Sequence, residues 1–297
     1  MHPFDPERME KLPGPCRFFD INGLWYFANG WAVRWLYDKP VSANQITVIS
    51  LVFGFISAGF YISSHSNPLI FGAIFLYGKL FFDNVDGPLA RVRGETSRLG
   101  RFLDSFVDFV INVAVYVALS YYLVRHTGQA YWWAVGLVAL LSCLIHCSLF
   151  VFYLVQYTTR VGSYDKNRVR EALTETDYAA WKKGKLPAFV FFLQNIHQWI
   201  YDWQDNLIER LDGIFKRLAG TEKDDNWYLD KVFLALASPL CLCTNTMALI
   251  VFSLIDRLDV CFFLVVVGGN VYMLGITIWK IFHFRRLIHQ EKTLPPY

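Results

Sequence analysis

The sequence has few charged residues and lacks several features that would assign it to a common class of protein. Charged residues make up 18% of the 297 positions and the net charge is +3, with the basic residues spread over several short stretches. This pattern gives no support to nucleic-acid binding, which needs a concentrated basic surface. The first 20 residues contain charges and prolines where a signal peptide would need an apolar core. We therefore expect the first spanning helix to direct membrane insertion.

Cysteine is also scarce and wrongly spaced for a metal or disulfide framework. Five of the six cysteines lie inside apolar runs, and the closest pair has C-x-C spacing, not the C-x2-C spacing typical of zinc sites. The six are Cys16, Cys143, Cys147, Cys241, Cys243 and Cys261. We expect them to be small packing residues, with neither a disulfide nor structural zinc.

Apolar residues are abundant in contrast: 55% of the chain is hydrophobic, 18% is aromatic, and the mean hydropathy is +0.31. Six segments are long and apolar enough to cross a lipid bilayer, which takes about 20 residues. They are residues 44–64, 68–90, 102–124, 131–156, 230–255 and 259–283. The sequence thus predicts an all-α, multi-pass integral membrane protein.

Basic residues follow one side of this predicted arrangement. They occur in the N-terminal segment 1–43, between the second and third spans, and in the polar insertion 157–229 between the fourth and fifth spans. The connections after the first, third and fifth spans contain few basic residues. By the positive-inside rule, the basic side and both termini are cytoplasmic. Because there is no internal repeat, we expect a single membrane domain over residues 1–297.

Two segments outside the spans have amphipathic or interfacial character. Residues 21–38 are rich in Trp and Tyr and predict a helix along the cytoplasmic leaflet, or alternatively a short helix packed on the bundle. Residues 192–218 place apolar side chains at three-and-four spacing opposite a charged face, which predicts an amphipathic helix. That helix could lie on the membrane, cover the active site or contact a partner subunit; a simple architectural role is the interpretation we favour.

Four aspartates lie at the ends of the second and third spans. Asp83 and Asp86 are three residues apart, and Asp104 and Asp108 are four apart, so each pair shares one helix face. An ionised carboxylate near hydrocarbon costs about 2.5 to 3.5 kcal/mol at a helix centre, so the group needs a compensating partner. Divalent cations bind carboxylate oxygens. The sequence therefore predicts a metal site where these two spans meet.

The same stretch fits the signature D-x2-D-G-x2-A-R-x8-G-x3-D-x3-D at every fixed position. The fixed positions are Asp83, Asp86, Gly87, Ala90, Arg91, Gly100, Asp104 and Asp108. In this it resembles the CDP-alcohol phosphotransferases, integral membrane enzymes that transfer a phosphoalcohol group from a cytidine diphosphate donor to a hydroxyl and release CMP. The resemblance covers only 26 residues.

The resemblance implies a role for each aspartate and an oligomeric state. Asp83, Asp86 and Asp104 would chiefly be ligands of two Mg²⁺ or Mn²⁺ ions. Asp108 would be the general base, also touching a metal, with metal polarisation or burial assisting it. Relatives commonly form homodimers, so we expect one here.

The remaining signature residues are predicted to surround the CDP-linked donor. Gly87 and Ala90 lack bulk and would let the nucleotide or a neighbouring helix approach the backbone. Arg91 would bind a phosphate, pair with a carboxylate or serve as a plain positive-inside anchor. Gly100 would let the chain enter the third span close to the second.

Three further polar residues are candidates for donor binding. Asn44 and Thr47 open the first span, and a similar Asn-x-x-Thr pattern precedes the signature in many relatives; a helix cap and a surface hydroxyl explain them equally well. Lys79 lies four residues before Asp83 and shares its face. Inside a span it would balance the carboxylates, contact a substrate phosphate or extend to the membrane surface.

Acceptor recognition is less well defined. Polar residues within the spans would line an acceptor pocket or form interhelical hydrogen bonds: Asn112, His146, Asn245 and Asn270. Relatives that accept polyol phosphates often have a basic residue directly after the last signature aspartate, where this chain has Phe109. This difference weighs against a phosphorylated-inositol or glycerol-phosphate acceptor without excluding it.

The leading hypothesis is transfer of a phosphatidyl-type group from a CDP-lipid, such as CDP-diacylglycerol, to the hydroxyl of a small polar alcohol. An alternative is transfer of phosphocholine or phosphoethanolamine from a CDP-aminoalcohol to a lipid hydroxyl. A hypothesis of another class is a membrane cation transporter or channel, but the aspartates lie at one face and no matching ionisable set lies at the outer ends of the spans. A non-catalytic scaffold would leave the four carboxylates unexplained.

Overall fold

The computed structural model describes residues 4–25, 28–162, 181–182, 187–222 and 225–293. Throughout these ranges the regular structure is helical, without a β-strand. Six helical segments are long and apolar enough to cross a membrane, which confirms the predicted number. They are Ala43–Ile62, Pro68–Arg93, Arg98–Thr127, Trp132–Arg160, Asp225–Leu254 and Leu258–Gln290.

The first four spans are single helices: α2 (Ala43–Ile62), α3 (Pro68–Arg93), α4 (Arg98–Thr127) and α5 (Trp132–Arg160). Three of them extend beyond the apolar runs from which they were predicted. Capping residues set their ends: Ser42 and Gln45 form a capping box at the start of α2, and left-handed glycines close α3 at Gly94 and α4 at Gly128. These helix ends are therefore set by capping residues beyond the apolar runs, which hydropathy does not detect.

The fifth and sixth spans differ from the uninterrupted segments that hydropathy predicts. The fifth begins with the 3₁₀ turn Asp225–Tyr228 and continues with α8 (Lys231–Ala237), a second 3₁₀ turn Ser238–Leu240 and α9 (Leu242–Leu254). Pro239 lies in this turn, where it removes a backbone hydrogen-bond donor from the helix. The sixth consists of α10 (Leu258–Phe263), a π-helical stretch Leu264–Gly269 and α11 (Asn270–Thr293). A π-helical stretch leaves hydropathy unchanged and so escapes a sequence-based prediction.

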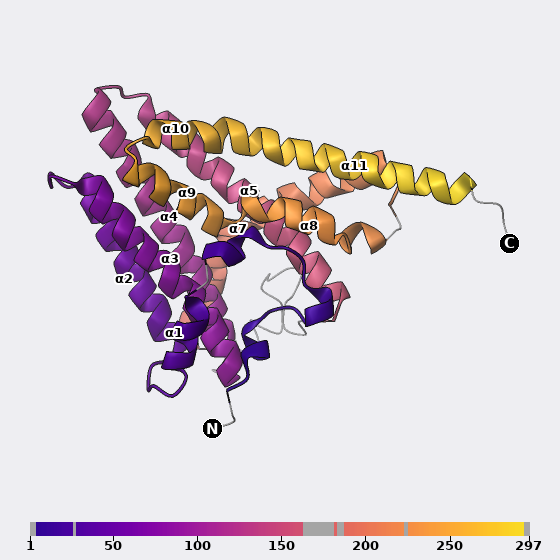
Figure 1. The fold of residues 1–297 in the computed structure, drawn as a ribbon, viewed down its shortest axis with the longest axis horizontal. Helices are drawn as coiled ribbons and strands as arrows, with labels where there is room; N and C mark the ends of the chain where they lie inside the picture. The colour runs from indigo at the N-terminus through magenta and orange to yellow at the C-terminus, as the bar shows by residue number, and fades with distance from the viewer. Residues whose placement is uncertain (1–3, 26–27, 163–180, 183–186, 223–224, 294–297) are drawn as a thin grey trace.

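The helices pack as one bundle (Figure 1). α2, α3 and α4 lie side by side, α9 packs on α3, and α5 packs on α4. The largest core cluster joins these helices with α10. A second cluster joins α5, α7 (Ala188–Ala219), α8 and α11 with the turn Asp225–Tyr228. The last turns of α3, which carry Asp83, and the first turns of α4, which carry Asp104 and Asp108, lie at the same end of the bundle. We call this end the polar end.

The predicted interfacial helix at residues 21–38 is shorter than expected. The structure has a 3₁₀ turn, Ile21–Trp25, and then α1, Asn29–Leu36. One face of α1 packs on α3 and buries Val33, while Trp31 on the other face is 73% exposed. α1 thus combines the two alternatives, because it packs on the bundle and still presents tryptophan outward.

The predicted amphipathic helix is confirmed as α7 (Ala188–Ala219), which begins directly after Pro187 and ends at the left-handed Gly220. Most of the charged segment before it, residues 160–185, lies outside the described residues. α7 packs against α4, α5 and α11. Its inward face includes the buried polar side chains Gln194, Gln204 and Asp212, so polar contacts as well as apolar ones hold it on the bundle.

Candidate metal centre and active site

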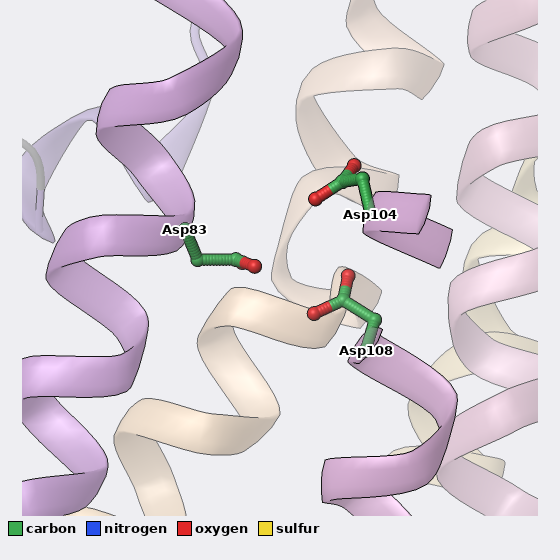
Figure 2. A group of neighbouring side chains, drawn as sticks. All are labelled: Asp83, Asp104 and Asp108. Atoms are coloured by element: carbon green, nitrogen blue, oxygen red, sulfur yellow. The ribbon is translucent and has the colours of Figure 1, made fainter. Parts of the chain in front are cut away.

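Three of the four signature aspartates converge at the polar end of the bundle. Asp83 points from α3 across to Asp104 and Asp108 on neighbouring turns of α4 (Figure 2). One carboxylate oxygen from each residue lies within 4.8 Å of the other two, and all three residues are partly buried. This spacing is compatible with shared coordination of a cation.

The short connection between α3 and α4 explains why the carboxylates meet. Gly94 ends α3 with a positive φ of 68°, and Ser97 caps α4 by accepting a hydrogen bond from the Gly100 amide at 3.0 Å. Asp83 lies 11 residues before Gly94 and Asp104 lies 10 residues after it. Because both helices rise about 1.5 Å per residue, these two aspartates stand at similar heights on antiparallel helices.

Asp86 is set apart from this group. Its Oδ2 accepts a hydrogen bond of 2.5 Å from Thr47 Oγ1 on α2, and the residue is only 6% exposed. The Thr47 hydroxyl also lies 3.2 Å from the Ala43 carbonyl in its own helix. The structure therefore connects Thr47 to a signature aspartate, which is a third role beside the donor contact and the surface hydroxyl that the sequence suggests.

Lys79 lies between the carboxylates. Its side chain is buried, and its Nζ lies 3.0 Å from Asp83 Oδ1 and forms a close ion pair with Asp108 Oδ1. Of the three roles considered for this lysine, the structure shows charge balance and not extension to the membrane surface. The side chain of Asp108 is 23% exposed and that of Asp83 is 10% exposed. Asp108 is therefore the more accessible of the two carboxylates that pair with Lys79.

The donor set fits a hard divalent cation. Asp83, Asp104 and Asp108 offer only carboxylate oxygens, the ligand type that Mg²⁺ and Mn²⁺ prefer. Three ionised carboxylates and the single ammonium of Lys79 would carry a net charge of −2, which one divalent cation would neutralise. The buried Asp83 Oδ1 accepts no hydrogen bond of good geometry, although the ammonium lies beside it. A further cation would therefore stabilise this cluster.

The small residues of the signature differ in what surrounds them. A Cβ added at Gly87 would meet only Arg91 Nη1 within 4 Å, at 3.3 Å, so most of the space beside Gly87 is open. A Cβ at Gly100 would lie 3.1 Å from Asn44 Oδ1. Gly100 therefore brings α4 close to α2 as well, whereas the sequence suggested an approach to α3. Ala90 is partly buried on α3.

Arg91 has a contact that sequence reasoning did not anticipate. Its Nε and Nη2 donate hydrogen bonds of 2.9 and 2.6 Å to the carbonyl of Met9. These bonds attach the N-terminal segment to α3, one turn beyond Gly87. This role is in addition to the phosphate, carboxylate and anchoring roles that the sequence suggests.

The polar residues proposed for an acceptor pocket make contacts between or within helices. His146 Nε2 lies 3.3 Å from Asn270 Oδ1, and Asn270 Nδ2 donates to Ser142 Oγ at 2.9 Å. Asn112 and Asn245 donate to carbonyls one turn back in their own helices, at 2.8 and 3.2 Å. These contacts favour the interhelical and structural interpretation of the four residues.

Tyr201 on α7 is a neighbour of the site that sequence reasoning missed. Its hydroxyl donates a hydrogen bond of 3.0 Å to the carbonyl of Ser105, between Asp104 and Asp108 in sequence. Burial, with a further contribution from the charge of Asp108, raises the pKa of Tyr201 well above its usual value, so the hydroxyl keeps its proton. An inward polar residue on an amphipathic helix was the available signal.

A second polar cluster was also missed. Asp212 on α7 accepts hydrogen bonds of 2.5, 2.8 and 2.6 Å from Tyr153, Trp227 and Tyr228. Nearby on α11, Lys280 Nζ donates to the Trp227 carbonyl at 2.8 Å. The lone lysine in the apolar sixth span was a signal for this cluster, which joins α5, α7 and α11.

Comparison with known proteins agrees with the signature. Residues 40–204, more than half of the chain, match the model of the CDP-alcohol phosphatidyltransferase family. A bifunctional IPC transferase and DIPP synthase from Thermococcus kodakarensis is 32% identical over 110 residues, covering 37% of this chain and 24% of that protein. An archaetidylinositol phosphate synthase from Pyrococcus horikoshii is 31% identical over 86 residues, covering 29% of this chain and 44% of that protein.

The inner membrane protein YnbA from Escherichia coli is 31% identical over 85 residues, covering 28% of this chain and 42% of that protein. The chain thus spans less than half the length of each of these three relatives. The family model, in contrast, includes the whole signature and the spans that carry it. The chain belongs to the CDP-alcohol phosphatidyltransferase family.

Proposed function

We propose that this protein transfers a phosphatidyl-type group from a CDP-lipid, such as CDP-diacylglycerol, to the hydroxyl of a small polar alcohol and releases CMP. The observation that carries the proposal is the convergence of Asp83, Asp104 and Asp108 within 4.8 Å, at the signature positions of a family that uses CDP-linked donors. This geometry is what charge neutralisation at a diphosphate requires.

Asp83, Asp104 and Asp108 would hold Mg²⁺ or Mn²⁺, with Asp86 completing a two-ion site. When bound, the metal would neutralise the diphosphate and stabilise the departing CMP. Lys79 would keep the carboxylates together before the donor arrives, since it already pairs with Asp83 and Asp108. The open space beside Gly87 would admit part of the donor, because a side chain there would fill it.

Asp108 is the proposed general base. It is the more exposed carboxylate of the two that pair with Lys79, so an acceptor hydroxyl can reach it. The acceptor oxygen forms a bond to the phosphorus of the phosphatidyl group as its proton passes to Asp108. The bond from phosphorus to the CMP oxygen breaks, and CMP leaves with that electron pair. The proton on Asp108 is then released to solvent.

The name of one relative supports a lipid donor over a CDP-aminoalcohol. The Pyrococcus horikoshii protein is named an archaetidylinositol phosphate synthase, and that name describes a lipid joined to a polar cyclitol. By analogy we assign a polyol to the acceptor side. Phe109 follows the last signature aspartate, so no basic side chain at that position contributes to recognition of a phosphorylated acceptor.

We further propose that residues 1–297 act as one membrane unit with the active site and both termini in the cytoplasm, and that two copies form a homodimer. Hydrogen bonds connecting the N-terminal segment with the later helices support the single unit. Tyr157 donates to the Cys16 carbonyl at 2.8 Å, and Lys231 donates to the Pro15 carbonyl at 2.6 Å. Sidedness rests on the distribution of basic residues, and the dimer rests on the family resemblance.

The test is CMP release by the purified full chain in lipid nanodiscs with Mg²⁺ or Mn²⁺. CDP-diacylglycerol is offered with inositol, inositol phosphate or glycerol phosphate, and CDP-ethanolamine is offered with diacylglycerol. We expect release only with CDP-diacylglycerol, and a loss of about 100-fold or more for Asp108→Asn. Asp259→Asn, at an exposed aspartate in the first turn of α10, is the matched control and should retain activity. Release with CDP-ethanolamine alone would reverse the donor assignment, and release from neither donor would overturn the function.

A further inference from the structure

α7 presents an apolar stripe on its outer side. Large apolar side chains recur in steps of four and seven residues along the helix and are at least 36% exposed. The stripe consists of Phe192, Trp199, Trp203, Leu207, Ile214 and Leu218. Trp199 is the most exposed of these, at 79%. Because steps of four and seven return to one side of a helix, these residues form a single continuous face.

The inward face of α7 makes this outward stripe unusual. The buried side holds Gln204 and Asp212, which bond to Ser148 at 2.7 Å and Tyr153 at 2.5 Å on α5. An amphipathic helix on a protein in water would place its tryptophans inward and its amides outward. α7 has polar and apolar contacts to the bundle on one side and exposed tryptophan on another, so its outer face is suited to an apolar environment.

The position of α7 on α5 identifies that environment. Ser148, which Gln204 covers, lies on the same face of α5 as Leu137 and Leu141, because the spacings are four and seven residues. Leu137 and Leu141 are 58% and 40% exposed near the other end of this spanning helix. In a membrane-spanning helix such an exposed apolar face is suited to lipid, and α7 covers its continuation toward the polar end. The stripe on α7 is then the outermost surface at this place on the bundle.

The charged side chains of α7 are balanced. Three acidic and three basic residues accompany the stripe outside the buried face: Asp202, Asp205, Glu209, Arg210, Lys216 and Arg217. Helices attracted to anionic lipids are usually rich in Lys and Arg. Burial of Trp, Phe and Leu side chains at the boundary between headgroups and acyl chains needs no such excess. The surface thus fits a bilayer of any headgroup charge.

We propose that α7 is an in-plane membrane helix whose stripe is inserted into the headgroup–acyl boundary of the bilayer that the six spans cross. Its inner face meanwhile contacts α4 beside the aspartate cluster, through the Tyr201 hydroxyl and the Ser105 carbonyl. The depth of the bilayer boundary thereby sets the position of the α4 turn that carries Asp104 and Asp108. Docking does not depend on anionic lipid.

The test is the accessibility of spin labels on the full chain in phosphatidylcholine nanodiscs. Single cysteines are introduced in matched neighbouring pairs, Trp203→Cys with Asp202→Cys and Leu207→Cys with Glu209→Cys. The labelled unsubstituted protein gives the signal of the six native cysteines. For each label, accessibility to oxygen, which partitions into lipid, is compared with accessibility to a water-soluble nickel chelate. We expect oxygen to dominate at residues 203 and 207 and the chelate to dominate at residues 202 and 209, with the same values when anionic lipid is added.

Two other results would overturn the proposal. Protection of residues 203 and 207 from both agents would mean that protein covers the stripe, as in a dimer of this chain. Dominance of the nickel chelate at all four positions would place α7 in water. A variant that elutes at the same volume as the unsubstituted protein is folded. Two labelled positions in the stripe and two outside it ensure that the result does not depend on one label that disturbs its own site. Because accessibility is measured without turnover, failure here is distinguishable from failure of the proposed transferase activity.

Discussion

Replacing Lys79 by methionine would test whether the aspartate cluster is built to hold more positive charge than the protein supplies. Methionine has similar length and no charge, so the substitution removes the ammonium that pairs with Asp83 and Asp108. Removing one partner of a buried ion pair typically costs about 3 to 5 kcal/mol, because the other charge remains desolvated. Asp108 is 23% exposed and recovers some hydration, so we expect destabilisation near the lower limit, about 3 kcal/mol, when divalent cations are absent.

Added metal should reverse most of this loss. The three carboxylates of the variant would carry a net charge of −3 instead of −2, so a divalent cation binds the variant more tightly than the parent. A ligand at 100 times its Kd stabilises the folded state by about 2.7 kcal/mol. The variant should therefore show a larger rise in melting temperature between EDTA and Mg²⁺ than the parent protein.

Thermal unfolding in nanodiscs, followed by near-ultraviolet circular dichroism with EDTA and with a Mg²⁺ titration, measures both effects. Lys182→Met removes an exposed lysine and should melt as the parent does in each condition. Equal melting of Lys79→Met and the parent in EDTA would show that Lys79 does not neutralise the cluster. A low melting temperature that Mg²⁺ does not raise would show that the carboxylates are not a cation site.

Three other substitutions probe contacts elsewhere in the bundle. Gly269→Ala should lower stability by about 1 to 3 kcal/mol, because its Cβ would lie 2.4 Å from His146 Cε1. Thermal melting should show this loss, and adding His146→Ala to the same chain should restore part of it. Asp212→Asn should cost about 1 to 3 kcal/mol in the same assay, since an amide loses at least one of three hydrogen bonds to buried donors, whereas exposed Asp202→Asn should change little. Burial, together with the charge of Arg101, lowers the pKa of His197 to about 4 in the folded protein. As the pH falls below about 6.5, His197 becomes protonated in the unfolded chain but stays neutral in the folded chain, so the folded state loses stability. Between about pH 7 and pH 5, His197→Gln should therefore lose on the order of 2 kcal/mol less stability than the parent protein. Equal losses in the two proteins would show that protonation of His197 is not the cause.

The sequence was sufficient for the six spans and for the meeting of Asp83 with Asp104 and Asp108. Long apolar runs fix the spans, and helical spacing on either side of a short connection brings the carboxylates together. The position of Asp86 was not predictable in this way. Its carboxylate turns toward Thr47 on α2, and that contact depends on how α2 packs, which spacing within α3 does not encode.

Interruptions of helices were harder to predict than their existence. Pro239 divides the fifth span, yet a proline within an apolar run is also compatible with a kinked continuous helix. The π-helical stretch that ends at Gly269 has no signal in hydropathy. The His146 ring packs directly against the backbone of Gly269, where a Cβ would lie 2.4 Å from His146 Cε1. This contact between two helices is visible only in the three-dimensional structure.

Two lysines lie buried in predicted spans, and the charges around them distinguish a binding site from a structural contact. Lys280 lies 3.6 Å from Asp230, donates to the Trp227 carbonyl and is surrounded by aromatic rings. The neighbouring Asp212 is compensated separately by three hydrogen-bond donors. With Asp212 and Asp230 against one ammonium, that cluster would carry a net charge of −1, smaller in size than the −2 of the aspartate cluster beside Lys79.

The cluster around Lys79 has the larger excess of carboxylate, three for one ammonium. One ammonium is shared by Asp83 and Asp108, with Asp104 close by, and a buried oxygen of Asp83 accepts no hydrogen bond of good geometry. Buried charge that its own protein leaves uncompensated is costly unless a ligand completes it during function. The excess of carboxylate over ammonium, more than the presence of a charged residue within a span, is therefore the physical reason to place the chemistry at the junction of α3 and α4.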